Sequence, residues 1–267
     1  MHRVDRRHPD YPEGLRGIGP EALRWRGSPL PRPRVAVVGS RRPTPLGLSF
    51  ATRVGRELGR AGVCVVSGGA FGIDAAAHRG CLEVGGFTAA VVLEPIDRPS
   101  PRAHRILFED IAANGALLAD PTLPPRRSSF IQRNRWIAGV ADHVVVVEAA
   151  AGSGSLSTAT FARRFGRPVW AVPGPPGAPL SIEPNTLIKL GAALLDDPKD
   201  LLTSLGLKAR DSRDRHPILE LLDGKPMDAE AVALSLGASL EEVLLALSEL
   251  EVAGDVRQDR GLYLARR

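Results

Sequence analysis

The sequence VAVVGSR at residues 35–41 joins a short apolar run to a turn that carries a serine and an arginine. Four consecutive apolar residues, most of them β-branched, are typical of a strand buried in a parallel sheet. Gly39 allows a sharp turn, and Ser40 and Arg41 lie where the next helix is expected to begin. Free N–H groups, the positive helix end and a guanidinium group would converge there on one anion. The segment therefore predicts an anion-binding turn in an α/β fold.

A second strand and turn follow one βαβ unit later. VCVV at residues 63–66 predicts another buried strand, and SGGAFG at residues 67–72 predicts a glycine-rich turn into a helix. Because the carboxyl ends of parallel strands open onto the same edge of a sheet, both turns are expected to face one crevice. Either turn alone could be a plain strand-to-helix connection. The candidates here are Ser67, Gly68, Gly72 and Asp74, the last of which favours the helix dipole.

A third segment, SSFIQRNRWIAG at residues 128–139, predicts a helix that begins at a serine cap. Arg133, Asn134 and Arg135 place hydrogen-bond donors where an apolar core would not need them. Arginines that clamp phosphates and an aromatic plane such as Phe130 are the combination that single-strand binders use. The alternative is an ordinary solvated helix face.

The remaining apolar runs extend the same pattern. Further strands are predicted at residues 87–93, 116–119, 144–147 and 168–172, with helices near 103–115 and 155–166. Strands that alternate with helices indicate a mostly parallel sheet. Glu148 is expected to brace the neighbouring turn GSGS (152–155), which enters a helix at Ser155; a hydrogen bond to a ribose is the alternative. Lys189, in a short helix predicted at 185–191, can point toward the crevice.

The C-terminal part has a different character. Residues 204–215 lose the apolar rhythm and predict a charged linker. Helical periodicity at 218–222, 229–236 and 240–250, followed by an alternating hairpin pattern at 256–264, predicts a winged helix. The expected domains are an N-terminal extension (1–33), a Rossmann-like domain (34–203), the linker and a winged-helix-like domain (216–267).

Charge separates these domains. The formal net charge is +5, but residues 216–267 contain five Lys and Arg against ten Asp and Glu. The remaining residues carry 30 basic against 20 acidic side chains, so this larger part can face phosphates. The expected recognition helix carries Glu241, Glu242, Glu249 and Glu251 and contains no lysine or arginine, which opposes insertion into a DNA groove. We therefore predict a protein-contact, regulatory or structural role for the terminal domain.

The sequence gives no sign of a metal site or a membrane segment. Its two cysteines, Cys64 and Cys81, form no CxxC motif or Cys/His cluster, which favours a reducing cytoplasm and predicts no zinc and no cofactor. No apolar run approaches the ~18 residues that a membrane span needs. A cytoplasmic chain without a membrane partner is expected.

Taken in order, these segments resemble the DNA-processing protein A family (DprA, also called Smf). The resemblance rests on YPEGL (11–15), VGSR (38–41), SGGAFGIDAAAH (67–78), RNRWIAG (133–139), VEA (147–149), SGSL (153–156), VPG (172–174) and NTLIKLGA (185–192). It implies an extended Rossmann-like domain that binds single-stranded DNA and delivers it to the RecA recombinase during natural transformation, without catalysis. Other single-stranded DNA-binding proteins are further possible partners.

The resemblance also implies which residues contact DNA. They are Ser40, Arg41, Ser67, Gly68, Gly72, Asp74, Phe130, Arg133, Asn134 and Arg135, to which we add Ser155 and Lys189. The family works as a dimer through the Rossmann-like domain, and the apolar stretch 187–195 is a candidate interface. Because the family-like segment begins almost at Met1, the N-terminal helical domain of many relatives is expected to be absent.

The chain departs from the family pattern at three places. Gly69 replaces a leucine, Glu183-Pro184 replaces a glycine, and SPRAH (100–104) replaces a Tyr-Pro-x-x-Asn segment. We expect His104 to be an ordinary, partly exposed histidine.

A nucleotide hydrolase is the second hypothesis. Nucleoside monophosphate phosphoribohydrolases of the lonely-guy type share a Rossmann-like sheet, and their working glutamate follows a Pro-Gly-Gly-x-Gly-Thr loop. Here no acid follows GSGS (152–155) within one helical turn, and Glu148 precedes it. A dinucleotide dehydrogenase fits less well, because Gly39 is not part of a G-x-G-x-x-G pattern.

Overall fold

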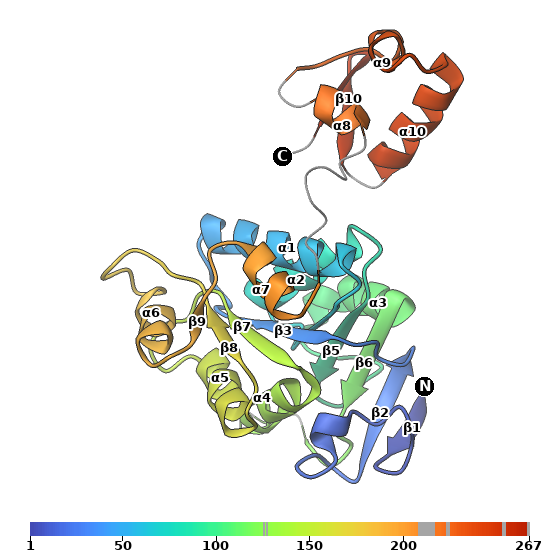
Figure 1. Ribbon diagram of the computed structural model, residues 1–267. Coiled ribbons are helices and arrows are strands. Elements are labelled where there is room, and N and C mark those ends of the chain that lie inside the picture. The colour runs from blue at the N-terminus through green and yellow to red at the C-terminus, as the bar shows by residue number, and fades with distance from the viewer. Residues whose placement is uncertain (125, 127, 208–216, 223–224, 253–254, 266–267) are drawn as a thin grey trace. The chain divides into compact units, whose positions relative to one another are not determined.

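The structure is a computed structural model that describes residues 1–124, 126, 128–207, 217–222, 225–252 and 255–265. The chain divides into two compact units, residues 1–209 and residues 210–267. The first unit is built on one large mixed sheet (Figure 1).

The sheet of the first unit has nine strands in the order β1-β2-β6-β5-β4-β3-β7-β8-β9. Their bounds are β1 His2–Asp5, β2 Ala22–Gly27, β3 Arg34–Val38, β4 Cys64–Ser67, β5 Thr88–Val92, β6 Gly115–Ala119, β7 His143–Val146, β8 Val169–Ala171 and β9 Ala193–Leu194. The pairs β1–β2 and β2–β6 are antiparallel and all other pairs are parallel. The predicted apolar strands and the mostly parallel, Rossmann-like sheet are confirmed.

The strand order changes direction at β3. This strand pairs with β4 on one side and with β7 on the other, so the chain builds outward from β3 in both directions. The loops that leave β3 and β7 therefore diverge at a topological switch point, the place where open α/β sheets bind ligands.

Helices cover both faces of this sheet (Figure 1). On one face lie α1 Pro45–Arg60, α2 Ile73–Leu82, α3 Arg105–Asn114 and α7 Pro198–Ser204; on the other lie α4 Ser129–Val140 and α5 Gly154–Arg164, with α6 Ile182–Lys189 beside β8. Alternation along β3 explains the two cores, because Val35 and Val37 pack with α1 whereas Ala36 and Val38 pack with α4 and α5.

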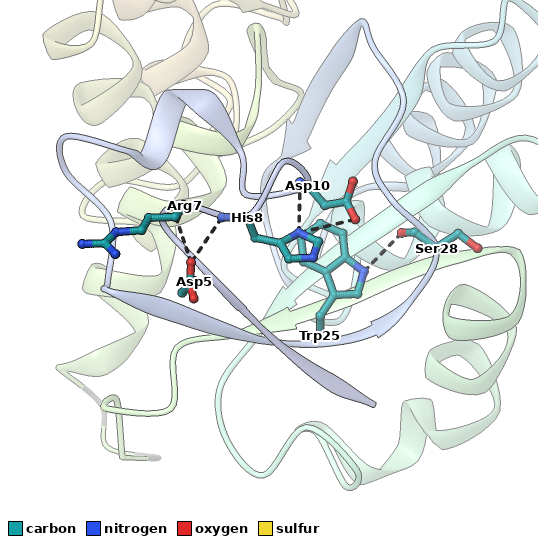
Figure 2. Close-up of polar contacts among 6 residues, drawn as sticks. All are labelled: Asp5, Arg7, His8, Asp10, Trp25 and Ser28. Atoms are coloured by element: carbon teal, nitrogen blue, oxygen red, sulfur yellow. Dashed lines mark hydrogen bonds and ion pairs between the residues drawn. The ribbon is translucent and has the colours of Figure 1, made fainter.

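The N-terminal extension is part of the sheet, because β1 pairs with β2 and β2 pairs with β6. Figure 2 shows the polar contacts of the turn that follows β1 and of Trp25 in β2. The Asp5 carboxylate accepts hydrogen bonds from the backbone N–H groups of Arg7 (2.8 Å) and His8 (3.2 Å), which closes the chain after β1. The Trp25 indole N–H donates to the Ser28 carbonyl at 3.2 Å. A short 3-10 helix, η1 Glu13–Leu15, lies between β1 and β2 and packs against α4.

The second unit has the winged-helix elements that the sequence predicts. They are α8 Pro217–Leu221, α9 Ala229–Leu236, α10 Leu240–Val252, β10 Val256–Asp259 and β11 Leu262–Ala265, the last two antiparallel. Ile218, Val232, Val243, Leu247 and Val256 form its core. The predicted three helices and hairpin of the winged helix are therefore confirmed.

Most of the predicted linker, residues 208–215, lies outside the described residues. Leu205 and Leu207, at its beginning, pack against the core formed by α1, α7 and the sheet. Among the described residues no single helix is long and apolar enough to cross a membrane, although α9 and α10 together reach that length and composition with a 114° bend between them.

Candidate nucleic-acid interface

Two arginines from different parts of the chain lie over the same aromatic ring. The guanidinium carbon of Arg41 is 5.3 Å from the centroid of the Phe130 ring, and that of Arg133 is 5.7 Å from it. Both contacts are within the range of cation–π attraction. The Arg41 side chain is exposed, and within the described parts of the chain it has no carboxylate partner. We call these three residues the Arg41–Phe130–Arg133 cluster.

The turn after β3 differs from the prediction in its details. Ser40 is buried, its N–H donates to the Glu148 carbonyl (2.6 Å), and its carbonyl accepts from Ile73 N–H (3.1 Å). Its hydroxyl accepts from Arg42 N–H at 3.1 Å. Helix α1 begins only at Pro45. Arg42 and Thr44 each precede a proline, and helical backbone geometry is unfavourable for a residue in that position. The expectation that Ser40 has a free N–H is therefore wrong, and the exposed side chains of this turn include Arg41 and Arg42.

Glu148 braces the start of α1 instead of the turn at residues 152–155. Its two carboxylate oxygens accept from the Thr44 backbone N–H (2.8 Å) and hydroxyl (2.6 Å). Thr44 is the N-cap of α1 and accepts in turn from Gly47 N–H (3.1 Å). The carboxylate therefore has a structural role, and α1 is fastened to the end of β7.

The turn after β4 surrounds a buried carboxylate. Asp74 is only 6% exposed, and one carboxylate oxygen accepts from the backbone N–H groups of Gly68 (3.2 Å) and Ala70 (3.3 Å). Burial raises the pKa of Asp74, while the nearby Arg133 charge and the two N–H groups oppose that rise. The Asp74 carboxylate stabilises the turn from inside and does not face solvent.

Arg133 is buried rather than solvated. It is 4% exposed, and one terminal N–H donates to the Val91 carbonyl at 3.3 Å. Burial lowers the pKa of Arg133 to about 10, with Asp74 opposing the shift and Arg41 adding to it, so the group stays charged at neutral pH. A Cβ atom at Gly68 would overlap this guanidinium. The buried Arg133 guanidinium therefore contacts both the turn at Gly68 and the Phe130 ring.

An aromatic residue that the sequence reasoning missed lies in the same turn. Phe71 is 46% exposed, and its ring meets the His104 ring edge-on with centroids 4.6 Å apart. His104 belongs to a 3-10 helix, η2 Arg102–His104, and its Nδ1 donates to the Gly69 carbonyl at 3.0 Å. The prediction that His104 is partly exposed is wrong, because it is 6% exposed and supports the turn. An aromatic residue between two glycines of an anion-binding turn was the available signal for Phe71.

Ser67 and Gly72 join the turn after β4 to its neighbours. Ser67 is fully buried, and its hydroxyl donates to the Val37 carbonyl at 2.6 Å, which fastens the end of β4 to β3. Gly72 has a φ of 77°, and a Cβ atom there would collide with the Ser40 carbonyl. The two turns thus touch at Gly72, where only glycine fits.

The remaining candidates on α4 and α5 are mostly internal. The Asn134 amide donates to the Gly154 carbonyl (2.8 Å) and the Ser157 hydroxyl (3.0 Å), which ties α4 to α5. Ser155 is buried and its hydroxyl bonds to that of Ser153 at 2.8 Å. Ser153, not Ser155, caps α5, which begins at Gly154. The predicted Ser128 cap of α4 is also wrong, because its side chain makes no capping hydrogen bond.

Two basic candidates lie apart from the cluster. The half-buried Arg135 places its guanidinium carbon 5.5 Å from the Trp136 ring, and helical geometry directs it away from Phe130 and Arg133. Lys189 is exposed in the last turn of α6, and no ion pair of it is found among the described residues.

A hollow of about 540 Å³ lies against the side of α4 that carries Gln132 and Trp136. Arg3 and Asp120 also line it, but no member of the Arg41–Phe130–Arg133 cluster does. Among the residues that the structure describes, no group of three or more His, Cys, Asp or Glu side chains could hold a metal ion. The Arg41–Phe130–Arg133 cluster itself combines two cationic side chains with one aromatic ring.

Two family models match the chain. The model described as DNA recombination-mediator protein A matches residues 2–206, and that of the DprA winged helix domain matches residues 196–261. A putative DNA processing protein DprA from Mycobacterium tuberculosis is 39% identical over 236 residues, which cover 82% of this chain and 61% of the relative. The chain thus spans about three fifths of the length of the first curated relatives that it matches.

Two solved structures share the fold. The X-ray structure of DNA processing protein A from Streptococcus pneumoniae has a TM-score of 0.70 and 35% identity, with 76% of this chain and 74% of that chain covered. The protein of the same name from Helicobacter pylori, whose structure concerns its single-stranded DNA binding mode, has a TM-score of 0.64 and 28% identity, with 73% and 92% covered.

Proposed function

The chain belongs to the DNA recombination-mediator protein A family, and from this membership we propose that it binds single-stranded DNA at the Arg41–Phe130–Arg133 cluster. The observation that supports this proposal most strongly is the position of two guanidinium groups over one partly exposed aromatic ring, beside the switch point of the sheet. Arginines neutralise phosphates and a ring stacks on a base whatever its sequence. Single strands offer both groups together, whereas a duplex hides its base faces.

The candidate residues divide into those that reach DNA and those that hold them in place. Arg41, Phe130 and Phe71 form the contact surface, with the Arg133 charge beneath it. Ser40, Ser67, Gly68, Gly72, Asp74, Asn134 and Ser155 keep the turns and helices in position. Arg135 and Lys189 can contact only more distant nucleotides of a longer strand.

RecA loading is the second part of the proposal. A protein that covers single strands loosely and without sequence preference can deliver them to RecA in the cytoplasm during natural transformation. The resemblance of the sequence to the DprA family supports this role, as does the single-stranded DNA binding of the Helicobacter pylori relative.

A homodimer through the first unit would join two DNA sites, and the exposed Leu190 and Leu194 are candidates for that interface. Other single-stranded DNA-binding proteins are possible further partners.

We propose no catalytic role. A phosphoribohydrolase needs a free carboxylate beside its phosphate loop, but the Glu148 carboxylate is occupied by the Thr44 backbone and hydroxyl. The Asp74 carboxylate is buried against the backbone of its own turn. The geometry around Glu148 and Asp74 therefore favours single-stranded DNA binding over the hydrolase alternative.

The test is fluorescence anisotropy of a labelled oligothymidine with the whole chain, competed with unlabelled single strand and with duplex. We expect single strand to compete and duplex to compete far less. The logarithm of the binding constant should fall linearly with that of salt, by about 0.7 for each phosphate neutralised. Equal competition by duplex, or binding that salt does not change, would refute the proposal; release of free base from nucleoside monophosphates would favour the hydrolase.

A further inference from the structure

The helix α10 of the second unit is apolar on two sides. Val243 and Leu247 are buried in the core of the unit, while Leu240, Leu244 and Leu245 are 41%, 42% and 64% exposed. A surface helix of a globular domain normally turns a polar face to solvent. In a winged helix the third helix is the element that usually enters a DNA groove. Here the outward side of that helix presents leucines instead.

The charged residues of α9 and α10 are all acidic. No lysine or arginine occurs between residues 226 and 252, whereas five glutamates do, namely Glu230, Glu241, Glu242, Glu249 and Glu251. Helical geometry places Glu241 between Leu244 and Leu245 on the outward side of α10. Glu242 caps the helix, since its carboxylate accepts from the Ser239 N–H (3.0 Å) and hydroxyl (2.7 Å). Within the described part of the chain, Glu241, Glu249 and Glu251 have no basic partner.

We propose that the outward face of α10 is a docking surface for a basic amphipathic helix of a protein partner. Leucines that protrude from one helix suit the apolar stripe of another. Glutamates around and between them suit lysines or arginines at the edges of that stripe and repel acidic partners. The same charges oppose duplex DNA, and they oppose a second copy of this face, which would set glutamate against glutamate. A basic helix is the occupant that satisfies both the apolar and the charged groups.

This inference is independent of the single-stranded DNA site. It uses only residues of the second unit, whereas the Arg41–Phe130–Arg133 cluster lies in the first. Loss of one binding activity should therefore leave the other unchanged. That separation makes the two proposals distinguishable in one set of proteins.

The experiment titrates the whole chain into a labelled peptide of about 18 residues, which is about five helical turns. The peptide contains leucines at the spacing of one helical face and lysines elsewhere; a second peptide has glutamate in place of every lysine. We expect the lysine peptide to bind and the glutamate peptide not to bind. The double variant Leu244→Ser with Leu245→Ser should bind the lysine peptide about tenfold more weakly, as expected for central apolar contacts.

Two controls separate docking from general charge attraction. Leu46→Ser changes a leucine of the first unit that is 81% exposed and should leave peptide binding unchanged. The Leu244/Leu245 double variant should keep its circular dichroism spectrum and its affinity for single-stranded DNA, because both leucines are exposed. The proposal is overturned if the whole chain does not bind the lysine peptide, if it binds both peptides equally, or if the double variant binds like the wild type. It is also overturned if duplex DNA binds the wild type and this variant loses that binding.

Discussion

Arg133 occupies the space that any side chain at Gly68 would need, since a Cβ atom there would overlap its guanidinium. The two residues come from β4's turn and from α4, so this contact fixes the distance between the glycine-rich turn and the helix that carries Phe130. The Asp74 carboxylate stabilises the same turn by accepting hydrogen bonds from the N–H groups of Gly68 and Ala70. The proposed binding surface therefore rests on two buried charged side chains, Asp74 and Arg133, and not on the exposed side chains alone.

Gly68→Ala should displace Arg133 and loosen the cluster. We expect a loss of about 1–3 kcal/mol in the free energy of unfolding, as for an overfilled core, together with weaker binding of single-stranded DNA. Urea unfolding followed by tryptophan fluorescence reports on the first unit, because all three tryptophans lie there. Gly17→Ala is the matched control, since no atom lies within 4 Å of its added Cβ and its φ is not positive. Equal stability of the Gly68 and Gly17 variants would contradict the account.

Phe71→Ala should weaken single-stranded DNA binding without destabilising the protein. Loss of one stacking partner costs about 1–3 kcal/mol of binding free energy. The ring is 46% exposed, so the free energy of unfolding should change little. Phe71→Tyr keeps the aromatic plane and should bind nearly as well as wild type. Anisotropy titrations of the three proteins check this, and equal affinities for the Ala and Tyr variants would remove Phe71 from the site.

His78 should make stability depend on pH. Its Nδ1–H donates to the Thr88 hydroxyl (2.7 Å), and burial lowers its pKa to about 3 from an ordinary value of 6.5. Between those values the unfolded chain binds a proton that the folded chain does not, so stability falls as the pH falls through this window, by up to about 1.4 kcal/mol per pH unit.

His78→Asn removes this titration while keeping an N–H donor for Thr88. We expect its unfolding free energy to lose about 1 kcal/mol less than that of wild type between pH 6 and pH 5. Urea titrations at both pH values measure the difference. Parallel losses in the two proteins would show that His78 is already protonated in the folded state.

Thr44→Ala should destabilise α1 by removing its cap. The hydroxyl of Thr44 accepts from Gly47 N–H and donates to Glu148, so its loss should cost about 1 kcal/mol of unfolding free energy. Thr160→Ala serves as control, because that exposed hydroxyl only donates to the Leu156 carbonyl within its own helix. The same urea experiment compares them, and a Thr44 variant as stable as the Thr160 variant would show that the cap contributes nothing.

The parallel strands of the sheet could be predicted from the sequence because they contain continuous apolar runs. Runs such as VAVV (35–38) and VCVV (63–66) are apolar throughout because parallel strands are buried on both faces. β1 and β2 were harder to predict, since both contain arginine and β2 pairs with β6, which lies about ninety residues away in the chain. Such a pairing depends on tertiary contacts that local patterns do not contain.

The structure brings Arg41, Phe130 and Arg133 together, but several other predicted site residues are buried or lie elsewhere. Arg133 and Asn134 were expected to be exposed donors, yet both are buried. Helical spacing contained the signal, because they share a face with Ile137, which packs in the core. The roles of Glu148 and Ser40 could not be predicted, since their partners at Thr44 and Ile73 come from other turns.

The most direct test of the central claim is the affinity of Arg41→Ala for labelled single-stranded DNA, measured beside Arg79→Ala. Both arginines are exposed in the first unit, but Arg79 lies in the last turn of α2, away from the cluster. The account predicts a loss of about 1–3 kcal/mol for Arg41→Ala, a salt slope reduced by about 0.7, and wild-type affinity for Arg79→Ala. Wild-type affinity in the Arg41 variant, or an equal loss in both variants, would contradict the proposed site.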